Sequence, residues 1–317
     1  SRYCNSFCSL PMLKVHRMTC AHNKKKTSMN TDTHIAYLSL ANHFYATRLP
    51  GIPVSELNEF TIIGALLRAA PEYRPDYFRR LRNALALDQK LRNHFWIAQE
   101  INRTLNPVTV LGLSQKRKQA RRRRISDDDF ATLVSALIER DLIAEAGALL
   151  LISMTGARPC ELSGITVKGQ LIKVPGAKHS HGGLRGADRE LEASQDFCNL
   201  VSNALHAFQL QTRSLDSMRM AIRETAKEIF PRGRIPSMYT LRHQFGSNLK
   251  ASGLSRVEIA YVMGHQATDS IARYGDKRFG RAEAVQVKPA READLSKVRT
   301  THATYAKSHS KVLRISC

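Results

Sequence analysis

Apolar side chains recur with helical spacing through the first third of the chain, where prolines separate the segments. Two apolar faces are formed by Ile35, Leu38, Ala41 and Phe44, and by Leu57, Phe60, Ile63 and Leu67. Residues three or four apart lie on one side of an α-helix, so each set predicts an amphipathic helix. Pro75 suits the first turn of a further helix through residues 77–92, because the N–H that it lacks would be unpaired there. The pattern predicts a small all-helical domain over residues 32–113.

A second domain is predicted over residues 126–284, where the periodicity changes. Ser126 and Asp129 have the spacing of a capping box before an apolar helix. Residues 141–154 form another apolar helix, which is too short to cross a bilayer. Short β-prone runs follow at residues 165–167, 171–174 and 189–191. The expected fold class is therefore mainly α with a small β-hairpin sheet.

The stretch of residues 239–275 contains three side chains suited to phosphate chemistry, namely Arg242, His265 and Tyr274. Signals for helix ends separate them. Ser255 and Glu258 form a capping box before an apolar run, and Gly264 can end that helix in a left-handed cap. Thr268 can cap a short helix that carries the tyrosine. The three side chains should therefore lie at the ends of short helices, where they can converge.

The charge of the chain points to a polyanionic partner. Its formal net charge is +22, from 49 Lys and Arg against 27 Asp and Glu, which is more than solubility requires. Nucleic acid is the first candidate, because no apolar run approaches the ~18 residues that a membrane span needs. The first thirty residues lack the apolar core of a signal peptide, and the six cysteines do not have the pattern of a disulfide framework. We expect a cytoplasmic, DNA-associated protein.

Residues 1–31 form a basic leader that contains residue types found in zinc sites: Cys4, Cys8, His16, Cys20 and His22. Their spacing does not fit such a site, because three residues separate Cys4 from Cys8 and the loop to His16 is shorter than that of a usual zinc finger. We expect this leader to be disordered and assign it no role.

Residues 114–125 form a basic linker, with seven positive charges and no acidic residue from Ser114 to Arg124. Between two domains of a DNA-binding chain, such a segment is predicted to cross the DNA backbone and contact phosphates. A localisation tag is the alternative interpretation. The DNA-binding residues expected here are Lys116, Arg117, Lys118, Arg121, Arg122, Arg123 and Arg124.

Two sequence boxes resemble those of the tyrosine recombinase (phage integrase) family. Residues 155–162 read TGARPCEL, which is similar to the family's first arginine box. Residues 241–274 contain LRH, then MGH, then a tyrosine nine residues after that histidine. These motifs cover roughly residues 125–280, and residues 32–122 match by layout only. The resemblance implies a helical core-binding domain followed by an α+β catalytic domain, which close over DNA from opposite sides.

The resemblance also implies how a phosphodiester would be cut without metal or ATP, so no cofactor is expected. Arg158 and Arg242 would neutralise the non-bridging oxygens, because a planar, permanently charged guanidinium suits them. Tyr274 would be the nucleophile and leave a covalent intermediate. His265 would hydrogen-bond the phosphate or orient the nucleophile.

Members of the family carry an essential lysine on a β-hairpin, where it protonates the leaving 5′ oxygen. Lys178 is the expected residue, and Lys173 and Arg185 are the alternatives. His179 and His181 lie beside the predicted turn without a third ligand, so we interpret them as loop residues and not as a metal site.

The chain departs from the family at Tyr239, where a histidine usually stands two residues before Leu-Arg. A phenol can donate and accept a hydrogen bond, but it is a poorer base than imidazole near neutral pH. We keep Tyr239 among the expected catalytic residues, although the identity of the proton acceptor stays open. His243, which follows Arg242, is predicted to be a packed, structural histidine.

The leading expectation is a site-specific DNA recombinase or integrase with a 3′-phosphotyrosyl intermediate. A hairpin telomere resolvase or type IB topoisomerase-like enzyme with the same chemistry is one alternative, and a non-catalytic DNA-binding protein on the same fold is another. The expected partners are double-stranded DNA with paired recognition sites, further copies in a homo-tetramer on DNA, and an accessory DNA-bending protein. Residues 285–317 are expected to be a tail, and residues 278–285 either dock on a neighbouring protomer or are disordered.

Overall fold

The computed structural model describes residues 31–118, 120–177 and 188–300, and the chain divides into two compact units after Lys118. This division falls inside the expected linker. Lys178, His179, His181 and Arg185 lie outside the described residues, as do the zinc-type residues of the leader. Over the parts of the chain that are described, no helix is both long and apolar enough to cross a membrane.

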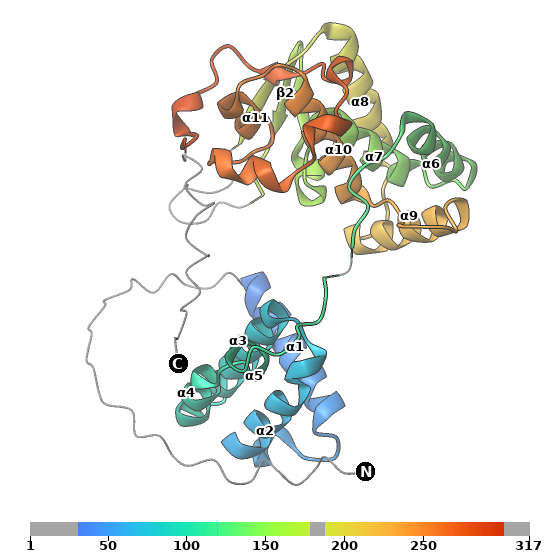
Figure 1. The fold of residues 1–317 in the computed structure, drawn as a ribbon. Coiled ribbons are helices and arrows are strands. Elements are labelled where there is room, and N and C mark those ends of the chain that lie inside the picture. Colours follow the sequence, from blue (N-terminus) through green and yellow to red (C-terminus); the bar gives the residue numbers. More distant parts are fainter. Residues whose placement is uncertain (1–30, 119, 178–187, 301–317) are drawn as a thin grey trace, which may run out of the picture. The chain divides into compact units, whose positions relative to one another are not determined.

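The first unit is helical in its described residues, as predicted (Figure 1). Its helices are α1 (Thr31–Arg48), α2 (Glu59–Ala69), α3 (Pro75–Leu91), α4 (Phe95–Arg103) and α5 (Pro107–Val110), with short 3₁₀ turns η1 (Val54–Glu56) and η2 (Ala70–Glu72). Pro75 begins α3, which confirms the predicted start. Phe44, Phe78 and Ile101 bring α1, α3 and α4 into one apolar core.

The predicted inward face of α2 is wrong. Phe60 is 80% exposed, whereas Ile62 and Leu66 are fully buried. Apolar residues occupy most positions of this helix, so spacing alone does not fix which side faces the core. The predicted face was counted from Leu57, but this residue lies before the helix. The helix begins after Asn58, whose side chain caps it by accepting a hydrogen bond from the Thr61 N–H. In α1, Ile35 is likewise 63% exposed.

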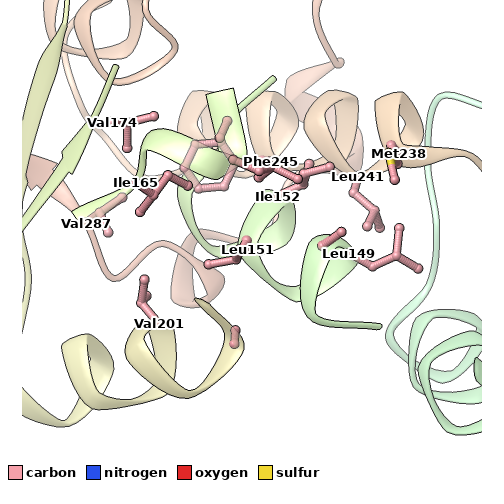
Figure 2. Close-up of a cluster of buried hydrophobic side chains, with 14 of the residues drawn as sticks. Leu149, Leu151, Ile152, Ile165, Val174, Val201, Met238, Leu241, Phe245 and Val287 are labelled. Carbon is pink, nitrogen blue, oxygen red and sulfur yellow. The ribbon is translucent and has the colours of Figure 1, made fainter. Parts of the chain in front are cut away.

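The second unit combines helices with one small sheet, and the structures described below confirm this fold class. Its helices are α6 (Asp127–Glu139), α7 (Ile143–Thr155), α8 (Gln195–Gln209), α9 (Leu215–Ile229), α10 (Met238–Ala251) and α11 (Arg256–Val262), with short 3₁₀ turns η3 (Pro159–Gly164), η4 (Thr268–Arg273), η5 (Lys277–Phe279), η6 (Ala282–Ala284) and η7 (Leu295–Lys297). The apolar helix α7 lies in the core and contributes Leu149, Leu151 and Ile152 (Figure 2). Phe245 and Leu241 of α10 belong to the same cluster.

The sheet is antiparallel with the order β1-β2-β3-β4. Strands β1 (Thr166–Lys168), β2 (Leu171–Val174) and β3 (Arg189–Glu192) fall where β-prone runs were predicted. In β3, Arg189 and Leu191 point to the buried side, while the two glutamates between and after them are partly exposed. Ile172 and Val174 bury the same side of β2, so this face of the sheet joins the core.

Strand β4 (Lys288–Pro289) corrects the boundary expected at residue 284. Leu191 pairs with Pro289 and Glu192 with Lys288, so this segment is an edge strand of the sheet. Val287 and Val298 are buried in the core of the second unit. The second domain therefore continues to about residue 300, which the sequence did not reveal because this stretch has no clear periodicity.

Candidate active site

Arg158 lies at a sharp junction between two helices. Helix α7 ends at Thr155, and Gly156 follows with a φ of 62°, the left-handed region that glycine adopts without strain. Pro159 then begins η3, so Arg158 is held in an extended conformation between them. Its Nη2 donates to the Gly264 carbonyl at 3.2 Å. The helix-end signals read from the sequence thus bring Arg158 against Gly264, the middle residue of the MGH motif.

A buried carboxylate, Glu161, binds two arginines at this junction. Its Oε1 lies 2.5 Å from Nη1 of Arg158, and its Oε2 accepts from Nη2 of Arg189 at 3.0 Å. The same carboxylate accepts the backbone N–H groups of Arg158 and Ala177. Burial raises the pKa of Glu161, but Arg189 and Arg158 outweigh it and hold this pKa at about 2. Glu161 is therefore an ionised carboxylate at the centre of the junction.

Arg242 is fully buried in the first half of α10. Its guanidinium donates to the carbonyls of Gly156 and Met263, and to Nε2 of His265 at 3.3 Å. Burial lowers the pKa of Arg242 to about 10, and the nearby Arg158 and Arg189 act in the same direction. The side chain is still cationic at neutral pH, and its Nε has no hydrogen-bond partner among the described residues.

His265 is 7% exposed and follows Gly264, whose φ of 62° ends α11 in the predicted left-handed cap. Burial, followed by Arg242 and Arg158, lowers the pKa of His265 to about 3, so the ring is neutral at pH 7. Since a guanidinium can only donate, Nε2 must accept from Arg242, and the ring proton then sits on Nδ1. Nδ1 is buried without a partner in the described part of the chain. It is an available hydrogen-bond donor.

Tyr274 lies directly after η4 and not within a helix, which corrects the predicted placement. Its ring centroid lies 4.9 Å from that of His265 and 5.1 Å from that of His243. The guanidinium carbon of Arg242 lies 5.0 Å from the same ring centre, within cation–π range. The phenol ring thus covers Arg242, and two imidazoles flank it.

The structure brings together four of the six expected catalytic residues: Arg158, Arg242, His265 and Tyr274. Lys178 lies outside the described residues. Tyr239 is 37% exposed in the first turn of α10, and no hydrogen bond or ring contact links it to the four within the described residues. Lys173, one of the two alternatives to Lys178, is exposed and pairs with Glu190 at 3.6 Å. The catalytic roles of all these residues remain predictions.

Two residues of the cluster were not predicted to belong to it, Glu161 and Arg189. Glu161 lies within the arginine box of residues 155–162, and its side chain has no exposed surface. Arg189 is 1% exposed, and in the part of the chain that the structure describes its Nε and Nη1 have no hydrogen-bond partner. The sequence did indicate that Arg189 is buried, because alternate residues of a strand face the same side and Arg189 therefore shares the inward face of β3 with Leu191. An arginine that points into a core requires an acidic partner, and this could have been inferred.

Within the described residues, two arginines of the basic linker contact the second unit, and Arg124 does so over the Phe279 ring at 4.4 Å from its centre. Arg122 pairs with Asp129, and its carbonyl accepts from the Thr240 hydroxyl at 2.9 Å. Arg121 and Arg123 are exposed, and their charges help to lower the pKa of His243, to about 4, after the larger effect of burial. These two arginines therefore lie near the ring that flanks Tyr274. Lys116 donates to the Glu72 carbonyl within the first unit at 3.1 Å.

The linker variant Arg121→Ala/Arg123→Ala should weaken binding to all DNA sequences about equally. Each lost phosphate contact should reduce the slope of log affinity against log salt by about 0.9. Arg122→Ala is the matched control, because its charge is already paired with Asp129 and it should alter stability more than the slope. The measurement is a salt titration of DNA affinity. A loss confined to one DNA sequence would show that the linker reads bases or groove shape.

Tyr239→Phe should lower the cleavage rate by about tenfold to a hundredfold, or 1.4 to 2.7 kcal/mol, if the hydroxyl hydrogen-bonds near the phosphate. Tyr239→His should retain or raise activity, because imidazole both donates and accepts and titrates near neutrality. Single-turnover rates between pH 6 and 9 would separate this role from simple packing. A fully active Phe variant with an unchanged pH profile would remove Tyr239 from the site.

The cluster is cationic, with three arginines and one carboxylate at its centre, and Arg242 and His265 each keep a donor that no described residue pairs. Such a site attracts an anion that carries several acceptor oxygens, as a phosphodiester does. Over the described residues, no group of three His, Cys, Asp or Glu side chains has the arrangement of a metal site.

No model of a known protein family and no curated protein sequence matches this chain. Solved structures match its fold. A lambda integrase tetramer bound to a Holliday junction aligns with a TM-score of 0.55 and 16% identity, over 80% of this chain and 74% of that chain. A lambda integrase dimer bound to a COC′ core site aligns with a TM-score of 0.53 and 16% identity, over 79% of this chain and 90% of that chain. The Tn1549 transposon integrase in complex with transposon right end DNA aligns with a TM-score of 0.50 and 12% identity, over 77% of this chain and 89% of that chain.

Proposed function

We propose that this chain, which has the tyrosine recombinase fold, is a site-specific DNA recombinase that cuts and rejoins DNA through a 3′-phosphotyrosyl intermediate. One observation carries the proposal: Tyr274 contacts Arg242 and His265, and Arg158 binds the carbonyl next to that histidine. These side chains come from three separate segments of the second unit. A tyrosine beside two arginines suits covalent attack on a phosphodiester.

In the proposed reaction, the Tyr274 hydroxyl loses its proton to solvent and its oxygen forms a bond to phosphorus, while the bond from phosphorus to the 5′ oxygen breaks. The 5′ oxygen takes up a proton as it leaves, and we assign this proton to Lys178. Reversal by a 5′ hydroxyl of a second strand rejoins the DNA, because the phosphotyrosyl bond conserves the energy of the original linkage. No metal or ATP is required for this balance.

The two arginines and the histidine would stabilise the charge that gathers on the non-bridging oxygens. Arg158 keeps 17% of its side-chain surface exposed and can meet the phosphate directly. Arg242 is covered by the ring of Tyr274, so the ring has to turn from the guanidinium toward the phosphorus as the phosphate enters. The Nδ1–H of His265 would be the third donor, and its use breaks no hydrogen bond to a described residue.

We further propose that the substrate is double-stranded DNA with paired recognition sites, and that four copies of the chain act together. The net charge of +22 supports a nucleic-acid partner. The lambda integrase of similar fold was solved as a tetramer on a Holliday junction, which supports the assembly. An accessory DNA-bending protein is a further proposed partner.

The test is to incubate the full chain with nicked or suicide DNA substrates that trap the covalent intermediate. We expect a protein–DNA adduct that withstands denaturation and whose DNA end carries a free 5′ hydroxyl. Formation of the adduct in the presence of a metal chelator would support the proposed chemistry. DNA binding without any adduct would instead identify a non-catalytic DNA-binding protein on this fold.

A further inference from the structure

One face of α10 contacts the main chain on the C-terminal side of the proposed nucleophile. The Gly275 N–H donates to Nδ1 of His243 at 3.4 Å, and the Asp276 N–H donates to the Ser247 hydroxyl at 3.0 Å. Lys250 donates to two carbonyls, that of Tyr274 at 2.6 Å and that of Gly275 at 2.9 Å. Residues 243, 247 and 250 are spaced by about one helical turn, so they form a single stripe along the helix.

The contact between this stripe and the segment is close and depends on glycine. Gly275 has a φ of 60°, and a Cβ atom at this position would collide with Ser247 and with the His243 carbonyl. A Cβ atom at Gly280 would likewise collide with the Ser247 carbonyl. The segment therefore lies directly on α10, and these positions admit no side chain.

Packing alone does not explain a lysine at position 250, because partial burial of its ammonium group is unfavourable. Burial lowers its pKa, and Asp276 opposes that effect only in part. An apolar side chain would fill the same space without the desolvation of an ammonium group. What the ammonium adds is a pair of charge-assisted hydrogen bonds to two successive carbonyls, that of the nucleophile itself and that of Gly275 after it.

We propose that Lys250, together with Ser247 and His243, is a set of positioning residues that fixes the main chain at Tyr274 and so aims its hydroxyl at the phosphorus. This inference rests on the proposed function. It also assigns a role to His243, whose ring lies against the Tyr274 ring and whose Nδ1 accepts from Gly275. A displacement of about 1 Å at an attacking atom can lower a rate by about a hundredfold.

Lys250→Met should lower the single-turnover rate of adduct formation by about tenfold to a hundredfold, while DNA affinity changes by no more than about twofold. Lys250→Arg should recover most of the rate, because a guanidinium can also donate to two carbonyls. Ser247→Ala should lower the rate in the same direction. Its matched control is Ser252→Ala, which removes a hydroxyl that donates to the Leu249 carbonyl at the end of its own helix, at 2.9 Å. The control should keep the normal rate.

A second substrate separates positioning from acid catalysis by the lysine. In DNA with sulfur at the 5′ bridging position, the thiolate leaves without a proton, so this substrate restores variants that lack the general acid. We expect no restoration of Lys250→Met, because its defect lies in the attack. Full restoration would make Lys250 the acid and overturn the positioning role.

The outcomes distinguish this inference from the proposed function. A wild-type chain that forms no adduct overturns both. A wild-type chain that forms the adduct, with Lys250→Met and Ser247→Ala equally fast, overturns the positioning role and leaves the proposed function intact. Thermal unfolding of each variant shows whether it is folded, and if Lys250→Met unfolds, Ser247→Ala and Lys250→Arg decide the question.

Discussion

Tyr274→Phe should abolish the covalent protein–DNA adduct and leave DNA affinity nearly unchanged. The phenyl ring can keep its contacts with His243, His265 and the Arg242 guanidinium, and only the attacking oxygen is lost. We expect a fall of at least about a thousandfold in the rate of adduct formation, or more than about 4 kcal/mol of transition-state stabilisation. The measurement is the covalent band on a suicide substrate, with affinity measured in parallel.

Tyr261→Phe is the matched control for this prediction. Tyr261 lies in α11, and its hydroxyl accepts the Glu190 N–H at 3.0 Å, a structural contact with β3. This variant should form the adduct and lose only some stability. If Tyr274→Phe still formed the adduct at the normal rate, the nucleophile would lie elsewhere, and Tyr261 and Tyr239 would be tested next.

Glu161→Gln should lower the free energy of unfolding by about 3 to 5 kcal/mol, because it leaves the buried charges of Arg158 and Arg189 without their counter-charge. The same change should lower the rate of adduct formation, since Arg158 loses the carboxylate that orients it. Urea unfolding at pH 7 gives the stability, and the adduct assay gives the activity.

The stabilisation that Glu161 provides should decrease as the pH falls. The pKa of Glu161 is about 2 in the folded chain, below the value of about 4.3 for an unfolded glutamate. Its stabilisation is therefore complete above about pH 5 and is lost as the pH falls toward 2. The stability difference between wild type and Glu161→Gln should shrink over this range. Glu228→Gln, which breaks an exposed pair with Arg140, is the control and should have little effect at any pH.

Local signals predicted much of the fold because they act within a few residues. The capping box of Ser255 and Glu258 is present in both directions, with the Ser255 N–H donating to the Glu258 carboxylate at 2.8 Å. Gly156 and Gly264 have the positive φ angles that their places at helix ends required. From these signals the sequence correctly predicted that Arg158 and His265 lie just beyond the C-terminal ends of α7 and α11.

Features that depend on contacts distant in sequence were missed. Strand β4 is short, and only its pairing with β3 makes it a strand. The face of α2 was misjudged because several of its sides are apolar, and packing against the rest of the unit selects one. Arg189 is explained only by Glu161, which lies 28 residues earlier in the chain. Periodicity within a segment carries no information about such partners.

Strand β4 also determines how the sheet meets other molecules. An open edge strand presents unpaired N–H and C=O groups that can pair with a strand of another chain. Here β4 pairs with β3 and is the outermost strand on this side of the sheet. It is only two residues long, and one of them, Pro289, has no N–H to donate. At the opposite edge, β1 is three residues long and ends in Lys168. Both edges are thus protected against adding foreign strands, so another protein chain would have to bind through surfaces other than the sheet edges.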